Sequence, residues 1–447
     1  MTLRWRAIKM AACVALLIGS QASAQTFSAV EFREIGKQNL QSGNLAGASA
    51  VVDALLARNS NDVGALILGA QVAMASGDLA EGARLAKRAY WWTRTSTDSF
   101  VAARIAANSH AGLEQDSLAQ LWLRRARQYS PNDETSADIA RDYTFLRNRN
   151  PWSTQLSFGI TPTSNVNGGG YGTINVGGLQ FDISEPLPGF EIKGNLSTSY
   201  RIDSTETYAT FLDLFANVRT YHLTEKANKI DPDATGSDYA SGSIGVGMRH
   251  RQIFVEGVLP TDLSLRFAQN WSEGEVRTRT LNFGLNQRFA VSDDTAISVN
   301  LSNQYLIDNE QAPATSVGAT TTWSQRLGDD RLRLSFSGLQ SYSDYRTRDY
   351  TNLRVSGSYD IGTAFNGLNF GFDFEHGIRV YNTRFLLFQN VDREDATSSI
   401  TLRVRNANIE LYGFQPIVSL TATRVDSNIN QFDSDFLSFG FDMQSSF

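Results

Sequence analysis

The side chains that could do chemistry are few, and their spacing does not match a catalytic centre. The chain has four histidines, which are His110, His222, His250 and His376. They are far apart, and none has metal-ligand spacing or a nearby nucleophile motif, so the sequence predicts no metal site and no His-nucleophile pair. The glycine run 168–170 predicts a flexible loop tip, because no helix is expected to follow it and form a phosphate cradle. We therefore expect no catalytic residue, no metal, no cofactor and no enzymatic activity, including that of a barrel hydrolase acting on lipid.

A second group of candidates consists of charged residues near the C-terminus. They are Asp373, Glu375, Arg379, Arg403 and Arg405. Such side chains could act as general acids or bind a substrate. They could also form an internal ion-pair network that keeps a pore shut or structured, which is the usual role of charges inside a barrel with a polar interior. We favour the ion-pair network.

These charges alternate with apolar residues, and the alternation runs through the last two thirds of the chain. Between residues 368 and 380, Leu, Phe and Ile occupy one face of an extended strand, whereas Asn, Asp, Glu and Arg occupy the other. The same pattern returns about fourteen times from Pro151 to Phe447 without an intervening helix. A closed barrel satisfies the backbone of such a chain in lipid, because closure leaves no open edge. The pattern predicts a 14-stranded antiparallel transmembrane β-barrel over 151–447, apolar toward lipid and polar toward the lumen.

The connections between the expected strands support this architecture. Short turns such as Asp203-Ser204 alternate with longer segments such as 163–189 and 382–395, as in outer-membrane barrels. Residues 174–184 could form one more strand, but an odd strand would break the alternation. We therefore place 174–184 in the first external loop, where it could fold into the pore.

The N-terminus has the pattern of a secretory signal. Arg4, Arg6 and Lys9 form a basic region, an apolar segment follows, and Ala22-Ser23-Ala24 is a cleavage motif. Residues 1–24 are therefore expected to be a signal peptide that is removed. The only cysteine, Cys13, lies inside this segment, so the mature chain would have no thiol, which fits an oxidising envelope compartment.

Residues 25–148 have a period of 3.6 instead of 2, which predicts helices. Gly43-Asn44-Leu45-Ala46 recurs as Gly77-Asp78-Leu79-Ala80 at an offset of 34 residues. A 34-residue period of paired helices is typical of tetratricopeptide repeats. We expect an α-helical tetratricopeptide-like solenoid of about three repeats over 25–148, in the periplasm. The polar pairs Asn61-Asp62, Thr97-Asp98 and Asn132-Asp133 are expected to end helices.

One of two adjacent tryptophans, Trp91 or Trp92, could bind a client in the concave groove that such repeats build. Large aromatic side chains are usually part of a core, so both could instead pack between repeats. Both interpretations remain open on the sequence alone, and the packed one is favoured.

Composition excludes two further classes. The chain has 40 basic and 46 acidic residues and a pI of about 5.4, so the basic stripe of a nucleic-acid-binding protein is not expected. The mean hydropathy is -0.27, and no stretch after the signal offers the apolar length of a membrane-spanning helix. Strands of alternating polarity are compatible with this value, because their two faces average out.

The last expected strand ends on an aromatic residue, Phe447. A strand that ends in this way resembles the signal read by the outer-membrane assembly machinery of Gram-negative bacteria. We therefore expect that machinery and outer-membrane lipid as partners, with 151–447 in the outer membrane and 25–148 in the periplasm.

One short motif carries a family resemblance. Pro162, Ser164, Asn165 and Asn167, in Pro-Thr-Ser-Asn-Val-Asn directly after the first strand, resemble the element that opens the barrel in the surface lipoprotein assembly modifier (Slam) family. The order of signal peptide, short tetratricopeptide domain and 14-stranded barrel is similar too. The resemblance implies translocation of client proteins, such as surface lipoproteins or secreted haem-binding proteins, with the helical domain engaging the client or its periplasmic chaperone. The alternative is a tetratricopeptide-barrel porin that exports an exopolysaccharide, since such porins join the same two parts.

Overall fold

The computed structural model describes residues 27–168, 173–176, 179–182, 185–255, 259–386, 389–406, 409, 411, 414–429 and 432–445. The expected signal peptide 1–24, Cys13 and Phe447 lie outside these residues. The chain divides into two units, Met1–Tyr143 and Thr144–Phe447, and each is considered by itself.

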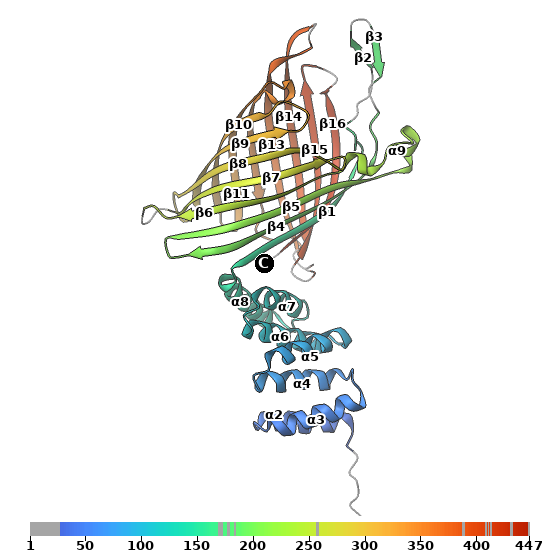
Figure 1. The fold of residues 1–447 in the computed structure, drawn as a ribbon, viewed down its shortest axis with the longest axis vertical. Coiled ribbons are helices and arrows are strands. Elements are labelled where there is room, and N and C mark those ends of the chain that lie inside the picture. The colour runs from blue at the N-terminus through green and yellow to red at the C-terminus, as the bar shows by residue number, and fades with distance from the viewer. Residues whose placement is uncertain are drawn as a thin grey trace, which may run out of the picture. The chain divides into compact units, whose positions relative to one another are not determined.

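Within the described residues, seven helices precede the first strand (Figure 1). They are α2 (Ala29–Gln41), α3 (Leu45–Arg58), α4 (Val63–Ala75), α5 (Leu79–Trp92), α6 (Ser96–Gly112), α7 (Asp116–Gln128) and α8 (Asp133–Arg149). Successive helices from α2 to α7 pack against each other, and α2, α3 and α4 share a core that includes Val51, Leu55 and Leu68. The α2 helix approaches this core closely at Gly36, where a Cβ atom would lie 2.5 Å from Leu68 Cδ2.

The repeated Gly-Asn/Asp-Leu-Ala segment forms the turn between two helices at both of its occurrences. Gly43 and Gly77 adopt positive φ angles of 79° and 86°, which suit glycine at a helix end. Asn44 and Asp78 then accept a hydrogen bond from the backbone N–H three residues on and start the next helix.

The three other polar pairs lie at helix starts, not at helix ends as the sequence analysis expected. Asp62 caps the start of α4, and Thr95 caps α6 ahead of Thr97-Asp98. Asn132 accepts a hydrogen bond from Thr135 N at the start of α8. The reason is physical: side-chain oxygens satisfy the free N–H groups of a first turn, which the last turn does not have.

The second unit contains a closed barrel of fourteen strands, each antiparallel to its neighbours. In chain order the strands are β1 (Trp152–Thr163), β4 (Gly189–Ser204), β5 (Tyr208–Leu223), β6 (Ser241–Gln252), β7 (Thr261–Ser272), β8 (Glu275–Ala290), β9 (Thr295–Asp308), β10 (Ala314–Leu327), β11 (Asp330–Ser343), β12 (Tyr350–Asp360), β13 (Leu368–Leu386), β14 (Gln389–Asn406), β15 (Phe414–Ser427) and β16 (Ser434–Ser445). The predicted strand number and architecture are confirmed.

Residues 382–395 are not the loop that was expected, because β13 and β14 continue through most of this range as a long hairpin. Residues 174–184 contribute β2 (Thr173–Val176) and β3 (Leu179–Asp182), which pair only with each other.

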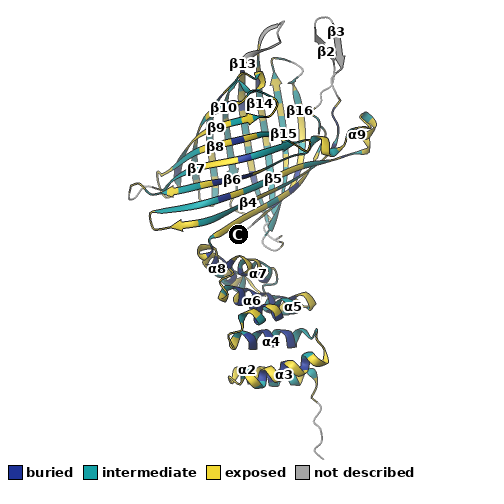
Figure 2. Cartoon of the chain, viewed as in Figure 1, coloured by how far each residue is buried: buried dark blue, intermediate teal, exposed yellow. Residues whose placement is uncertain are grey.

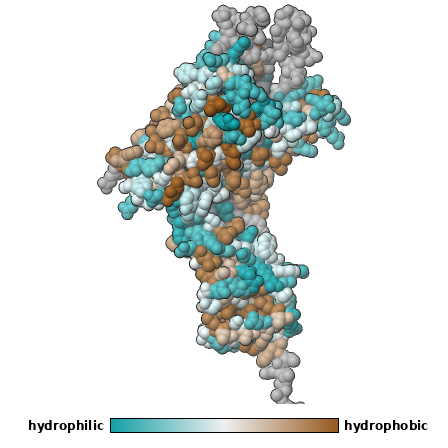
Figure 3. All heavy atoms as spheres, viewed as in Figure 1, coloured by the Kyte–Doolittle hydropathy of each residue, from teal (hydrophilic) through white to brown (hydrophobic). Residues whose placement is uncertain are grey.

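The two faces of the barrel wall differ as a membrane-spanning wall requires. On β11, Leu334 and Phe336 are exposed on the outside, whereas Ser335 and Ser337 are half-buried on the inside. Figure 2 shows exposed and less exposed residues alternating along the strands, and Figure 3 shows hydrophobic residues spread over the outer wall. Within the described residues, none of the helices has the length and apolar character needed to cross a membrane.

Candidate functional site

The lumen of the barrel carries the charges that the sequence analysis singled out. Arg403 lies between two acids: its Nε donates to Asp373 at 2.5 Å and its Nη2 reaches Asp360 at 2.9 Å. Glu375 pairs with Arg354 at 3.4 Å. The cross-strand register places these residues on the inner face of β12, β13 and β14, where such a network can hold three strands in one arrangement.

The two remaining predicted charges have no acid partner among the described residues. The Arg379 guanidinium lies over the Tyr350 ring at 4.5 Å from its centroid, which is a cation–π contact. Arg405 donates to Gln444 at 3.4 Å. Arg379 and Arg405 therefore leave positive charge in the lumen.

Further inward charges were not among the candidate residues that the sequence singled out. Lys193 on β4 pairs with Asp442 on β16 at 3.0 Å, and Arg249 on β6 pairs with Asp213 on β5 at 3.3 Å. The alternation of polar residues was the signal available for them. Three more acids on the inner face form ion pairs with arginines: Glu191 with Arg219, Asp262 with Arg251, and Asp395 with Arg393.

A group of arginines without acid partners lines the barrel end at which β1 begins. Arg326 on β10 and Arg331 on β11 are direct cross-strand partners, and Arg333 follows on the same face of β11. All three are exposed, and none forms an ion pair with a described residue. Like charges directly opposite each other destabilise a sheet, so this pair is costly unless an anion binds there. We name Arg326, Arg331 and Arg333 the arginine cluster.

Acids close to the arginine cluster do not neutralise it. Asp360 lies opposite Arg331 but bonds to Arg403. Asp294 meets Arg326 only through its backbone carbonyl, which accepts from Arg326 N at 2.8 Å. The chain as a whole has a formal charge of -6, so the arginine cluster is a local concentration of positive charge in an acidic chain. Such a cluster attracts anions and acidic polymer segments.

Other parts of the inner wall consist of small hydroxyl side chains bonded across strands. Ser316 donates to Ser341 at 3.0 Å, and Thr401 and Thr421 lie 2.8 Å apart. These side chains offer neutral hydrogen-bonding groups and little bulk. They suit passage of a polar chain better than tight binding or covalent chemistry.

The motif after β1 has a structural role. Asn167 donates from its Nδ2 to the Glu185 carbonyl at 2.8 Å and accepts from Leu187 N at 3.0 Å, so it closes the base of the first external loop. Asn165 N donates to Thr163 Oγ1 at 3.2 Å. Pro162 is the penultimate residue of β1, opposite Phe190 on β4, and Ser164 follows the end of β1.

In the helical unit, the two tryptophans are on the surface. Trp91 is 69% exposed and Trp92 is 55% exposed, which overturns the favoured expectation that both pack between repeats. The neighbouring Tyr90 and Trp122 fill the interior instead, with ring centroids 5.2 Å apart. Arg125 lies over both Trp122 and Trp91, at 4.4 Å and 5.4 Å, so Trp91 is held in place while its ring remains accessible. Trp91, Trp92 and Arg125 form what we call the tryptophan surface.

No group of three or more potential metal ligands occurs in the described part of the chain. His376 faces outward and bonds to Ser398 at 2.9 Å, and His250 bonds to Thr210 at the same distance. His110 is buried in α6, where its Nδ1–H donates to Gln115 Oε1 at 2.7 Å and its Nε2 has no hydrogen-bond partner among the described residues. Burial lowers the pKa of His110 below its ordinary value.

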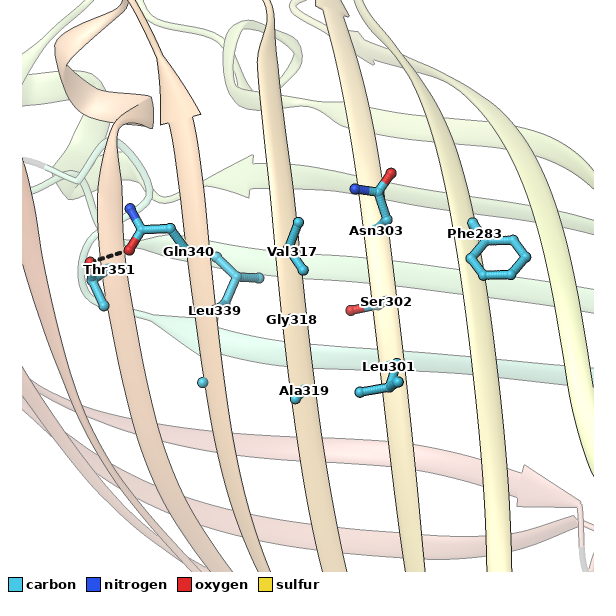
Figure 4. A pocket seen from close by; sticks show the side chains of 11 residues that line it. Phe283, Leu301, Ser302, Asn303, Val317, Gly318, Ala319, Leu339, Gln340 and Thr351 are labelled. Atoms are coloured by element: carbon cyan, nitrogen blue, oxygen red, sulfur yellow. Dashed lines mark hydrogen bonds between the residues drawn. The ribbon is translucent and has the colours of Figure 1, made fainter.

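A hollow on the outer wall, shown in Figure 4, is lined mainly by apolar side chains of β8 to β11. Phe283, Leu301 and Val317 are exposed on this lipid-facing side. At its edge the Thr351 hydroxyl donates a hydrogen bond to Gln340 Oε1 at 2.5 Å, so each of these polar side chains has a partner. An acyl chain of the bilayer can fill such a hollow, and nothing in its lining suggests chemistry.

No protein-family model and no curated protein matches the sequence. Solved outer-membrane barrels are similar in part. OmpTdeltaL8, a loop-deletion mutant of OmpT from Vibrio cholerae, is 9% identical with a TM-score of 0.34 and covers 66% of this chain and 99% of its own. OccAB3 of Acinetobacter baumannii is 8% identical, with a TM-score of 0.35 and coverage of 66% and 98%. A bacterial polysaccharide outer membrane secretin is 9% identical, with a TM-score of 0.31 and coverage of 66% and 98%. Because these likenesses are distant, function is argued from the residues of this chain.

Proposed function

We propose that this protein translocates or displays client proteins, such as surface lipoproteins or secreted haem-binding proteins, across an outer membrane. The helical unit would engage the client, alone or with a periplasmic chaperone, and the barrel would provide the exit route. The closed barrel with its apolar outer face supports an outer-membrane location, because no other arrangement of these strands satisfies the backbone in lipid.

The observation that carries this proposal is the tryptophan surface. Two adjacent tryptophans that remain largely exposed form an apolar surface that a partner can cover. Tryptophan and arginine are also the side chains that most often dominate protein interfaces. A chain that joins such a surface to a transmembrane barrel is suited to deliver a polypeptide to the barrel.

The second candidate is export of an exopolysaccharide. Free acids and aromatic side chains would be expected along the path of a neutral sugar chain. In this lumen the eight inward acids named in the preceding subsection are bonded to cations, and hydroxyl groups and arginines are among the polar groups that remain. This lining favours the protein-client proposal, although an acidic polysaccharide would also suit the arginine cluster.

Deletion of the gene separates the two candidates. Intact cells of the deletion strain would be treated with protease, and surface proteins and extracellular polysaccharide would be measured in parallel. We expect at least one surface protein to become protected while polysaccharide is unchanged, with display restored by the wild-type chain. If all surface proteins stay displayed and polysaccharide disappears, the second candidate is correct and ours is wrong.

A further inference from the structure

The barrel is closed by β1 and β16, and the pairing between these two strands is short. Their register consists of three pairs: Phe158 with Met443, Gly159 with Asp442 and Ile160 with Phe441. On their other sides the same strands are paired twelve times, β1 with β4 and β16 with β15. In the same register the end of β1 at Thr163 lies level with Ser438, so among the described residues the part of β16 from Ser434 to Leu437 extends beyond β1 and has a strand partner on one side only. We name this part of β16 the open edge.

The open edge results from the path of the chain after β1. If β1 and β16 stayed paired in the same register, Pro162 would lie opposite Phe439 and Ser164 would lie opposite Leu437. Proline has no N–H to donate, so the ladder weakens at this point. The following residues then turn away from β16, because Asn167 binds the backbone at 185 and 187 and Val166 N donates to Leu187 O at 2.8 Å.

Packing holds this path in place. Val166 contacts a small buried cluster formed by Leu187, Leu223 and Ala227, on the side of β4 and β5. The Pro-Thr-Ser-Asn-Val-Asn motif therefore does more than form a turn. It ends β1 at Thr163, so that β16 extends past β1 from Leu437 to Ser434 without a β1 partner.

The open edge lies at the level of the apolar outer wall. Leu437 is 65% exposed on its lipid-facing side, and Phe439 and Phe441 follow on the same face of β16. Backbone N–H and C=O groups that are unpaired in hydrocarbon are costly. An acyl chain cannot satisfy them, because it has no hydrogen-bonding groups, whereas an extended polypeptide can.

We propose that the open edge of β16 binds an extended segment of a client protein as an added strand, so that the β1–β16 seam is the place where the client contacts the barrel wall. This mode is β-augmentation: backbone hydrogen bonds provide affinity, and alternate side chains of the added strand face lipid and lumen. The partner is thus a segment in which apolar and small polar residues alternate. The inference rests on the proposed function for the origin of that segment, but strand binding can be measured without knowing the client.

The test uses the full chain in detergent and a biotinylated dodecapeptide of alternating threonine and valine. Leu437 is replaced by the photocrosslinking residue p-benzoylphenylalanine. The matched control is the same replacement of Leu334, which also faces outward but lies on β11, a strand paired on both sides. We expect a peptide adduct at position 437, competed by unlabelled peptide, and none at position 334.

Two further measurements exclude simple apolar adhesion. A peptide with alternate backbone N-methyl groups, which cannot continue a ladder, should give no adduct at position 437. The double variant Pro162→Thr/Asn167→Ala, which allows β1 to continue along β16, should lose the adduct with the unmodified peptide. Equal adducts at both positions, or an adduct with the methylated peptide, would overturn the inference.

Failure of this inference and failure of the proposed function give different results. If peptide capture fails while deletion of the gene removes a protein from the cell surface, the open edge is not the binding site and the function stands. If capture succeeds while every surface protein stays displayed, the edge binds strands but the proposed function is wrong.

Discussion

Asn167 and Leu187, which are 20 residues apart, are joined by a hydrogen bond of 3.0 Å from the Leu187 backbone N–H to the Asn167 side chain. The same side chain donates to the Glu185 carbonyl at 2.8 Å. One amide therefore closes the base of the first external loop, and the direction in which the chain leaves β1 depends on it.

Replacement Asn167→Ala should release this loop base without unfolding the barrel. Both hydrogen bonds are lost and two backbone groups are left unpaired, which costs about 1–3 kcal/mol of local stability. Hydrogen exchange at the Leu187 amide should become faster by roughly one to two orders of magnitude, given that 1.4 kcal/mol is about tenfold. Ser164→Ala is the matched control, because Ser164 is exposed in the same segment after β1. Unchanged protection of the Leu187 amide in Asn167→Ala would show that the side chain does not hold the loop.

The tryptophan surface should be separable from the helical core. Trp91→Ala and Trp92→Ala remove exposed side chains, so each should change the free energy of unfolding by less than about 1 kcal/mol. Trp122→Ala removes a side chain that is only 3% exposed and should cost about 3–5 kcal/mol. Denaturant unfolding followed by helical circular dichroism measures all three. A large loss of stability in either exposed variant would mean that the tryptophan belongs to the core.

The arginine cluster should make the pore prefer anions. The wild-type chain would be reconstituted into a planar bilayer with a KCl gradient across it. The sign of its reversal potential should show that chloride permeates more readily than potassium, because unpaired arginines at the mouth concentrate anions. The triple variant Arg326→Gln/Arg331→Gln/Arg333→Gln should lose most of this preference. The corresponding triple lysine variant should keep it, since lysine retains the charge. Potassium preference in the wild-type chain would contradict a cationic lumen.

Stability of the helical unit should fall in mild acid because of His110. Burial lowers its folded pKa below the ordinary value of 6.5, so between the two pKa values the unfolded chain binds more protons than the folded chain. The stabilisation is therefore complete above about pH 6.5 and is lost as pH falls through the lower, folded value. Thermal unfolding would be followed by the circular dichroism of the helices. As the pH falls below about 6.5, the midpoint temperature should drop for the wild-type chain and drop less for His110→Leu. Identical pH profiles for the two chains would rule out this role of His110.

The number and order of the barrel strands could be predicted because lipid on one side and water on the other impose a period of 2 on every crossing. That constraint ends where the strands leave the membrane. Residues 382–395 therefore looked like a loop, since Arg384, Asp392 and Glu394 show no apolar face, although β13 and β14 remain paired there. Above a membrane both faces of a hairpin meet water, and no alternation is needed.

Contacts that depend on closure could not be predicted at all. Lys193 and Asp442 are 249 residues apart, and they meet only because the last strand returns to the first. The short register between β1 and β16 is a consequence of closure in the same way. The exposure of Trp91 and Trp92 was missed for another reason. Tryptophan generally prefers a core, but here Tyr90 and Trp122 already fill the interior next to the two side chains.

The most direct test of the central claim is cysteine accessibility along β11 in a lipid bilayer. Single substitutions Leu334→Cys, Ser335→Cys, Phe336→Cys and Ser337→Cys would be treated with a water-soluble maleimide, because Cys13, the only natural cysteine, lies in the segment expected to be removed. A transmembrane wall with a polar lumen predicts labelling at 335 and 337 and protection at 334 and 336. Labelling at 334 and 336 with protection at 335 and 337, or equal labelling at all four positions, would contradict it.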